Sequence, residues 1–519
     1  MTPAPGQEKT AAGRYQELHT LRSPYLERAR DNAKLTIPAL LPPEGSNGST
    51  YLVKPYQSMG SQGVNNLGAK LLLALFPPNQ SFFRLAIPDS ALAELGAVSE
   101  MKSEIEQGLA KIEREVLGEV EGNAVRVTMG EAIKHLVVVG NYLLQGLPSG
   151  AIKGHRLDRY VVKRDPAGNM IECIVHEKVA RTVLPREFLA AIKDTADPSQ
   201  RDANAPLDIY TWVRRVGSEF KVHQEVAGAK VPGTEGSYPV DACPFIAIRW
   251  TKVDGEDYGR SHTDDCFGDL RSLEGLTGAV VEGSAAAAKV LLFVDPTGVT
   301  RMKDVAEAPN LAVRSGRAQD VTALQVEKSA DLTVAMNMAA TLERRLSAAF
   351  LMTRSVQRAG ERVTAEEIRL LASELEDALG GVYALLAQEL QLPFVRVLMA
   401  RLTKAGRIPA LPKSVKPMVV TGLQALGRNH ELNRLLTFSR AAQELLGPNA
   451  LSRINAGEAM RRVATALGVD AEGLVMTDDQ VAEMEGAARE QAMVEKLGPE
   501  VIRARSQPQP QEANSAPQA

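Results

Sequence analysis

The stretch between residues 261 and 352 constrains the fold more than any other part of the sequence. Two helical segments, at about 263–289 and 331–350, enclose an insertion of short β-rich and turn-rich runs at 290–328. Helices joined through so short an insertion are expected to run antiparallel. This pattern predicts a rod of two helices with a small cap at one end. Such a rod buries too little surface to be a globular domain by itself.

A longer helix is predicted to follow the rod. Residues 364–367 read T-A-E-E, which is a capping box, so we expect this helix to begin at Thr364. The pair Gly380-Gly381 favours a bend, and Pro393 cannot donate a backbone hydrogen bond, so a kink or an end is expected near Leu392. Apolar residues recur at steps of three and four and form one stripe: Ile368, Leu371, Leu375, Leu379, Val382, Leu386 and Leu390.

The segment 353–363 is a loop between the rod and this helix. It carries Arg354, Arg358 and Arg362 against one carboxylate, Glu361, although the formal net charge of the chain is -3. Exposed charges are common, so a solvated loop or salt bridges to a neighbouring segment are the simpler explanation of these residues taken alone.

The rest of the chain alternates between helical and β-rich regions. Pro24 after Ser23 is typical of a helix start, and that helix is expected to end before Pro38. Residues 155–250 consist of short β-rich runs separated by turns and predict a mostly antiparallel sheet. Further helices are expected at 57–76, 98–121, 125–146 and in pieces beyond Gly427, and the Pro/Gln-rich end is expected to be disordered.

Length and composition exclude several classes of protein. A chain of 519 residues exceeds what one core organises, so several domains or an elongated shape are expected. The small negative charge is not that of a nucleic-acid binder as a whole, so contact with DNA would depend on local patches or on assembly. Three widely spaced cysteines suit a reducing compartment. The apolar run LVVVGNYLLQGL is too short to span a bilayer and the N-terminus lacks an apolar export signal, which disfavours membrane insertion and secretion.

The motifs do not support an enzyme. GVNNLGAK at 63–70 differs from a phosphate-binding loop because its lysine does not follow the second glycine directly and no Ser or Thr follows that lysine. There is no G-x-S-x-G elbow. Paired carboxylates such as Glu366-Glu367 are explained as first-turn residues of helices. We therefore predict no catalytic residues, no metal and no cofactor.

HTDDCFGD at 262–269 is the one cluster that leaves an alternative open. In the simpler explanation, Thr263 caps a helix whose acidic first turn complements the helix dipole. In the alternative, the protein is a metal-dependent hydrolase, which would use four side chains: His262, Asp264, Asp265 and Asp269.

Three stretches resemble one protein family. They are GVNNLGAKLLLALFPP at 63–78, DGEDYGRSHTDDCFGDLRSLEGL at 254–276 and VQRAGERVTAEEIRLLASELEDALGGVYALLAQELQLPFVRVL at 356–398. The family is that of the portal, or head-to-tail connector, proteins of short-tailed double-stranded DNA bacteriophages, the autographivirus type of podovirus. The similarity extends over most of the chain and leaves out the leader and the Pro/Gln tail.

This resemblance implies an α+β, mainly α, portal fold assembled as a ring of about twelve identical subunits at one capsid vertex. It divides the chain into a wing at 1–260 that is completed by a kinked helix and connector at 364–426, stem helices at 261–289 and 329–352, a clip at 290–328, a channel loop at 353–363, a helical crown at 427–498 and a disordered tail at 499–519.

The resemblance also implies site residues. In the channel loop, Arg354, Arg358 and Arg362 would be repeated around the bore and would meet DNA phosphates without reading bases. The clip would direct its cations toward the packaging motor, the tail adaptor or DNA, although salt bridges between subunits explain these residues equally well: Arg301, Lys303, Arg314 and Arg317.

The partners that the resemblance implies are further copies of the chain, double-stranded DNA bound without sequence preference, the terminase large subunit, tail adaptor and tail tube proteins, major capsid and scaffolding proteins, and internal core proteins. No membrane is implied. The protein would belong to the virion, at the capsid vertex, and to the host cytoplasm during assembly. The energy for packaging would come from the separate ATPase.

Overall fold

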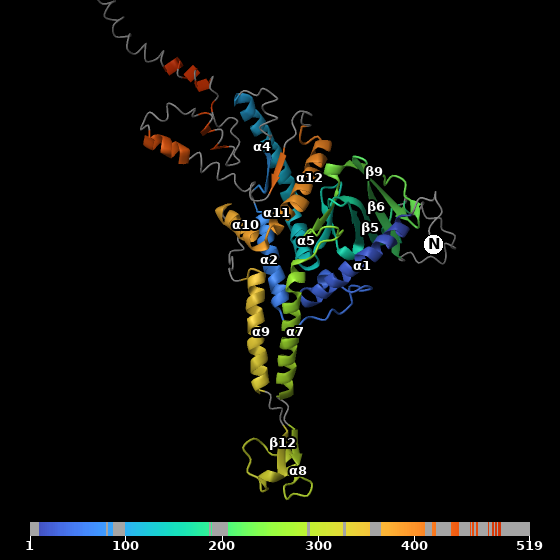
Figure 1. Cartoon of the computed structure of the whole chain (residues 1–519), viewed down its shortest axis with the longest axis vertical. Helices are drawn as coiled ribbons and strands as arrows, with labels where there is room; N and C mark the ends of the chain where they lie inside the picture. The colour runs from blue at the N-terminus through green and yellow to red at the C-terminus, as the bar shows by residue number, and fades with distance from the viewer. Residues whose placement is uncertain are drawn as a thin grey trace, which may run out of the picture. The chain divides into compact units, whose positions relative to one another are not determined.

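The computed structural model describes residues 10–78, 81–86, 99–185, 206–287, 291–324, 329–352, 365–409, 418–421 and 437–445, together with Phe188 and single positions between 457 and 488. The chain divides into two compact units, Met1–Leu426 and Gly427–Ala519. Among the described residues the first unit is mainly helical with four antiparallel sheets (Figure 1). In the second unit residues 437–445 are helical, and most of the predicted crown and the whole tail lie outside the described residues.

Helices α1 (Ala11–Leu35), α2 (Met59–Leu75), α4 (Ser99–Gly122) and α5 (Val125–Val139) build the core of the first unit. The helices predicted at 57–76 and 98–121 are confirmed. The helix predicted at 125–146 is wrong in its last part, because Gly140 adopts a left-handed conformation with φ 80° and ends α5. The chain then continues as strand β2 (Asn141–Gly146).

The prediction that a helix starts at Pro24 is also wrong. α1 begins at Ala11, where the Thr10 side chain caps it by accepting a hydrogen bond from the Gly13 N–H, and Pro24 lies inside the helix. The helix continues through Pro24 because its apolar face is buried on both sides of the proline, at Tyr15 and Leu18 before it and at Leu26 after it. Packing of that face outweighs the lost backbone hydrogen bond.

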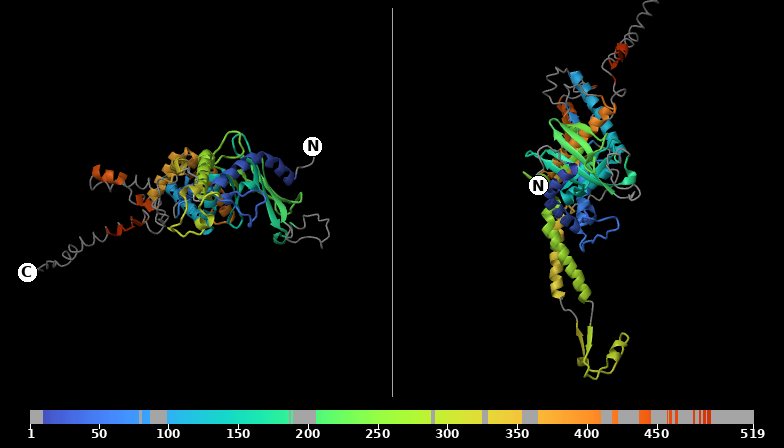
Figure 2. Two further views of the ribbon diagram at one scale, coloured as in Figure 1. Left: turned by 90° about the horizontal axis from the view of Figure 1, so that it is seen from below. Right: turned by 90° about the vertical axis from the view of Figure 1, so that its right-hand side faces the viewer.

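Strands from the region 155–250 form the predicted antiparallel sheets. The six-stranded sheet contains β4 (Tyr160–Arg164), β5 (Met170–Ala180), β6 (Pro206–Val216), β7 (Glu219–Val226), β8 (Ala229–Lys230) and β9 (Gly236–Pro239). A smaller sheet joins β10 (Phe245–Arg249) to β2 and β3 (Ile152–His155), two strands that begin before the predicted β-rich region. α1 lies along the larger sheet, where Tyr15 and Leu18 pack on Val161 and Trp212 (Figure 2).

The predicted kinked helix is four successive segments: α10 (Ala365–Leu379), α11 (Val382–Leu386), the π-helical turn η7 (Ala387–Gln391) and α12 (Leu392–Lys404). Gly380 and Gly381 both have positive φ and make the predicted bend. Pro393 lies in the first turn of α12, where its missing N–H is tolerated, so the chain continues as helix instead of ending. Thr364, the predicted cap, lies outside the described residues.

Strand β1 (Phe83–Ala86) pairs antiparallel with β13 (Met418–Thr421) and forms a two-stranded sheet of the first unit. By length and composition alone, the segment Val382–Lys404 is also apolar enough to cross a membrane, which sequence analysis did not single out. In the fold its apolar face is occupied by protein, because Leu390 and Val395 are completely buried. The side chain of Gln391 donates to the Leu75 carbonyl of α2.

Candidate functional site in the paired helices and their insertion

Helices α7 (His262–Ala287) and α9 (Ser329–Ala349) run side by side, which confirms both helices of the predicted rod (Figures 1 and 2). On α9, Leu342 and Leu346 are buried, and the side chain of Leu332 lies against Gly283 of α7. The less exposed positions of α9 at 332, 335, 339, 342 and 346 recur at steps of three and four, which makes a seam of the coiled-coil type. An ion pair between Arg345 and Asp269, 3.1 Å long, also joins the two helices.

The flanks of α9 beside this seam are apolar and exposed. From Leu332 to Leu342 the helix holds no charged residue. Val334, Met336 and Met338 are 69%, 58% and 56% exposed. Successive helical positions advance by about 100°, so Val334 and Met338 lie on one flank of the seam and Met336 lies on the opposite flank. The pair of helices therefore presents two different apolar patches, one on each side.

The C-terminal end of α9 is one of the places where the helix pair joins the core. Phe350 is completely buried, and its ring occupies the space beside Gly63 of α2, where a Cβ would lie 2.5 Å from Phe350 Cγ. His262 Nε2 is 3.0 Å from the Ala349 carbonyl oxygen, and its ring meets that of Phe350 edge-on. Burial lowers the pKa of His262, which favours the neutral imidazole at this contact.

Two polar side chains of α2 hold the residues that follow α9. The Asn66 amide donates to the carbonyls of Phe350 and Leu351 at 3.0 and 3.1 Å. The Lys70 ammonium donates to the Leu351 carbonyl at 2.9 Å and lies 4.0 Å from Glu374 of α10. Sequence analysis missed both residues. The available signal was weak: Lys70 is the one charged residue of α2, and Asn66 lies one helical turn before it.

The cluster at 262–269 does not converge on a metal. Asp264 accepts hydrogen bonds from the Asn32 amide at 2.6 Å and from the Ser261 N–H at 2.9 Å. Asp269 pairs with Arg345, and His262 faces the Ala349 carbonyl. Within the described residues there is no group of three or more side chains placed to hold a metal ion.

The predicted cap of α7 is also corrected by this geometry. Ser261 Oγ accepts from the Asp264 N–H at 3.0 Å while Asp264 accepts from the Ser261 N–H, which is a reciprocal capping box. Thr263 instead donates its hydroxyl to the Val137 carbonyl of α5. Ser261 therefore caps the helix, and Thr263 attaches it to the core.

The insertion carried by the helix pair is a small folded element. Strands β11 (Leu291–Val294) and β12 (Val321–Leu324) pair antiparallel, and a short helix, α8 (Met302–Ala306), lies between them in the chain. Asp320 accepts hydrogen bonds from the Thr300 N–H and hydroxyl at 3.0 and 2.9 Å. The Thr300 hydroxyl in turn accepts from the Arg317 N–H at 2.9 Å, so these residues hold the two arms of the insertion together.

All four predicted cations of the insertion are exposed: Arg301, Lys303, Arg314 and Arg317. Lys303 lies 4.0 Å from Glu307, and this is the single ion pair within residues 291–324. Leu311 and Val313 are 95% and 98% exposed beside them. The insertion thus presents exposed cations beside apolar side chains, and its four cations are matched in number by four carboxylates: Asp295, Asp304, Glu307 and Asp320. The other predicted cations, Arg354, Arg358 and Arg362, lie outside the described residues.

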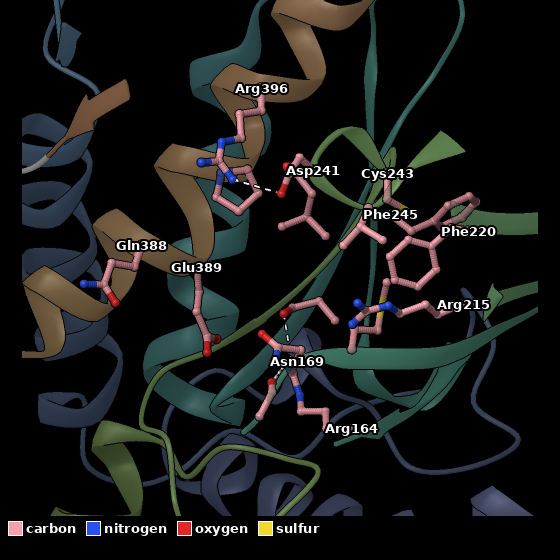
Figure 3. A pocket seen from close by; sticks show the side chains of 16 residues that line it. Arg164, Asn169, Arg215, Phe220, Asp241, Cys243, Phe245, Gln388, Glu389 and Arg396 are labelled. Carbon is pink, nitrogen blue, oxygen red and sulfur yellow. Dashed lines mark hydrogen bonds and ion pairs between the residues drawn. The ribbon is translucent and has the colours of Figure 1, made fainter. Parts of the chain in front are cut away.

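A separate pocket of about 420 Å³ lies between the six-stranded sheet and α12 (Figure 3). Arg396 reaches across it to Asp241 at 3.3 Å. Arg164 donates to the carbonyls of Gly168 and Ala247 at 3.0 and 2.8 Å. Burial raises the pKa of the Cys243 thiol to about 12, which favours the protonated thiol at neutral pH. These polar groups bind other parts of the same chain.

Comparisons with known proteins agree with these features. The family model described as "Bacteriophage head to tail connecting protein" matches residues 8–475. The portal protein of Escherichia phage T7 is 41% identical over 481 residues, which cover 91% of this chain and 89% of that protein. The portal protein of Enterobacteria phage T3 is 40% identical over 478 residues, with the same coverages, and that of Pseudomonas phage phiKMV is 29% identical over 484 residues, covering 92% and 94%.

Among solved structures, the chain is similar to one from the virion of a native gene transfer agent particle. The sequences are 12% identical, the TM-score is 0.35, and the match covers 79% of this chain and 90% of the other. The family match over most of the length and the two relatives with at least 40% identity carry the assignment. This chain belongs to the bacteriophage head-to-tail connecting proteins, and it is a portal protein.

Proposed function

We propose that this portal protein closes head-to-tail into a ring, most simply a dodecamer, at one capsid vertex, and that the ring passes double-stranded DNA during packaging and ejection. The observation that carries the assembly is the pair of different apolar patches on α9, around Met336 on one flank and around Val334 and Met338 on the other. A two-fold dimer uses one self-complementary patch, whereas a head-to-tail contact joins two different patches and generates a ring.

In this proposal the parts of the chain take the roles of a portal subunit. The α7–α9 pair is the stem, the insertion at 290–328 is the clip, residues 1–260 and 364–426 form the wing, and residues 427–498 form the crown. The segment 353–363 is the channel loop. A subunit of this kind needs no catalytic group of its own, because the packaging ATPase supplies the energy.

The channel loop follows directly on the junction where α2 holds Leu351. Repeated around a ring, Arg354, Arg358 and Arg362 would make a band of positive potential at one level of the bore. Phosphates of any sequence are attracted by such a band. Glu361 in the same loop limits the net charge, so DNA would be held weakly enough to move.

The clip offers the contact surface for the terminase large subunit and later for tail adaptor proteins. Its exposed arginines Arg301, Arg314 and Arg317 favour an acidic partner, and Leu311 and Val313 add apolar area that a partner would bury. Capsid and scaffolding proteins would contact the wing, and internal core proteins the crown. The ring would be found in the virion and, before maturation, in the host cytoplasm.

The assembly is tested by mixing two variants that each lose one flank. Met336→Glu removes one patch, and Val334→Glu combined with Met338→Glu removes the other. Each variant alone should stay monomeric, since each interface needs both patches. The mixture should give a heterodimer through the two intact patches. Mass photometry distinguishes these species from rings.

Asn337→Glu is the matched control, because Asn337 is an exposed position of α9 on the side away from the seam. This variant should still form rings. Rings formed by Met336→Glu alone, or a mixture that stays monomeric, would contradict the head-to-tail contact.

The DNA role is tested separately from assembly. The triple variant Arg354→Ala, Arg358→Ala, Arg362→Ala should form rings of normal mass but should package less DNA or lose it from filled heads. An unchanged yield of packaged DNA in this variant would count against the channel role. The clip triple variant Arg301→Ala, Arg314→Ala, Arg317→Ala should form rings that bind terminase more weakly, and the loss should shrink as salt is raised.

A further inference from the structure

Lys70 is a charged residue enclosed by the core. It lies on α2, and its side chain is 4% exposed. Its ammonium has two partners on different elements: the Leu351 carbonyl just beyond α9, at 2.9 Å, and the Glu374 carboxylate of α10, at 4.0 Å. These two partners stand on either side of the segment 353–364. One side chain therefore contacts both flanks of that segment.

The contact at the α9 side is reinforced by backbone geometry. Leu351 has φ 53°, a left-handed conformation that costs free energy in a residue other than glycine. Its carbonyl receives both the Asn66 amide and the Lys70 ammonium. A cation at this position also complements the negative end of the α9 dipole. The strained turn is therefore maintained by α2.

The contact of Lys70 with Glu374 on α10 differs from its contact with Leu351, because it is an ion pair with a partly exposed side chain. Glu374 is 28% exposed, so its carboxylate also faces solvent, whereas the ammonium does not. An ammonium needs several acceptors, and a buried one that loses an acceptor pays a desolvation cost. Displacement of either Leu351 or Glu374 therefore weakens the placement of Lys70 and, through it, the contact on the other side.

We propose that Lys70 is a positioning residue that couples the C-terminal end of α9 to α10, so that the two flanks of the segment 353–364 keep one relative position. Asn66 is excluded from this coupling, because its two hydrogen bonds both go to the α9 side. The coupling itself is a property of the single chain. Its consequence for DNA, a fixed height of the arginine band in the bore, rests on the proposed function.

Hydrogen exchange followed by mass spectrometry on the full-length protein tests the coupling. Lys70→Met should speed exchange about tenfold to a hundredfold in both flanks, at 342–352 and 366–379, because a hydrogen bond to a buried charge is lost. Glu374→Gln should speed exchange most in 366–379 and to a smaller extent in 342–352, because the ammonium that loses this carboxylate also holds the Leu351 carbonyl less firmly. Asn66→Ala should speed exchange mainly in 342–352, because both of its hydrogen bonds go to that side. Adding Glu374→Gln to Lys70→Met should change nothing further, since the shared ammonium is already absent.

Lys70→Arg is the conservative variant. It keeps the charge, so it should restore protection in both flanks relative to Lys70→Met, and it also serves if Lys70→Met does not fold. Two results for Lys70→Met would overturn the coupling and leave Lys70 as an ordinary stabilising residue. One is faster exchange in one flank only, and the other is faster exchange that extends equally to α5 and the six-stranded sheet.

Packaging by Lys70→Met rings separates this inference from the proposed function. Coupled exchange together with reduced DNA retention supports both. Coupled exchange together with normal DNA retention keeps the positioning role and overturns the link to the DNA channel. Uncoupled exchange overturns the positioning role whatever the packaging result.

Discussion

Arg249 and Glu389 form a buried ion pair that joins strand β10 to the π-helical turn η7. The Arg249 guanidinium donates through Nε and Nη2, and the Arg249 backbone N–H donates to the same carboxylate at 3.1 Å. The side chains are 2% and 18% exposed. A π-helical turn holds one more residue than an α-helical turn, so it changes the direction in which the following side chains point. Glu389 lies within this turn.

Loss of either member of this pair is expected to destabilise the fold strongly. Arg249→Met leaves the Glu389 carboxylate without its main partner, and Glu389→Leu leaves a buried guanidinium, so each should cost about 3–5 kcal/mol. The double variant should cost much less than the two together, because no unpaired charge remains. Thermal unfolding midpoints of the four proteins provide the test, and additive losses would contradict it.

Gly63→Ala should disturb the junction between α9 and the core. The added methyl group would lie 2.5 Å from Phe350 Cγ, so the buried ring must move. We expect a loss of about 1–3 kcal/mol, the usual cost of overpacking. Gly118→Ala on α4 is the control, since its methyl group would meet no atom within 4 Å. That change should be neutral or stabilising by up to about 1 kcal/mol. Equal unfolding midpoints for the two variants would contradict the contact.

Pro24→Ala should stabilise α1. Pro24 is exposed, so its replacement loses little packing, and alanine restores an N–H that can donate to the Thr20 carbonyl. The gain should approach about 3 kcal/mol if the helix is otherwise unchanged. Ser23→Ala, one residue earlier, should stay within about 0.5 kcal/mol of the parent protein. A lower unfolding midpoint for Pro24→Ala would show that the proline supports a bend that α1 needs.

His155 should make the protein less stable in mild acid. Burial lowers the pKa of His155 to about 4, and its Nε2 is 2.9 Å from the Gln145 side-chain oxygen. In the unfolded chain histidine titrates near ~6.5. Between these values only the unfolded chain binds the proton, so stability is complete above the unfolded pKa. It falls by up to about 1.4 kcal/mol per unit of pH as the pH is lowered toward 4.

Unfolding midpoints measured at pH 7, 6 and 5 should therefore fall for the parent protein, and the fall should be smaller for His155→Gln. Identical slopes for the two proteins would show that other groups cause the acid sensitivity. His262, whose pKa is lowered by burial as well, contributes in the same direction, so the slope of His155→Gln should not become zero.

The candidate site was only partly predictable. The four cations of the insertion could be identified from the sequence, because the charge of a side chain does not depend on the fold. Their exposure could also be expected, because the insertion is too short to form a core that would bury them. Asn66 and Lys70 were not recognised, since their roles depend on residues more than 280 positions away. The cluster at 262–269 shows the opposite case, because proximity in sequence suggested a convergence that helix geometry prevents.

The sequence by itself determined the local elements: the helix pair and its insertion, the antiparallel strands, and the bend at Gly380-Gly381. The spacing of apolar residues and the positions of glycine and proline affect the backbone over only a few residues. These signals therefore predict helices, strands and bends without knowledge of the fold. Only the tertiary structure decided that α1 runs through Pro24, that α5 gives way to β2, and that Lys70 joins α9 to α10. Each of these outcomes depends on burial against distant segments, and the free energy of burial overrides local preference.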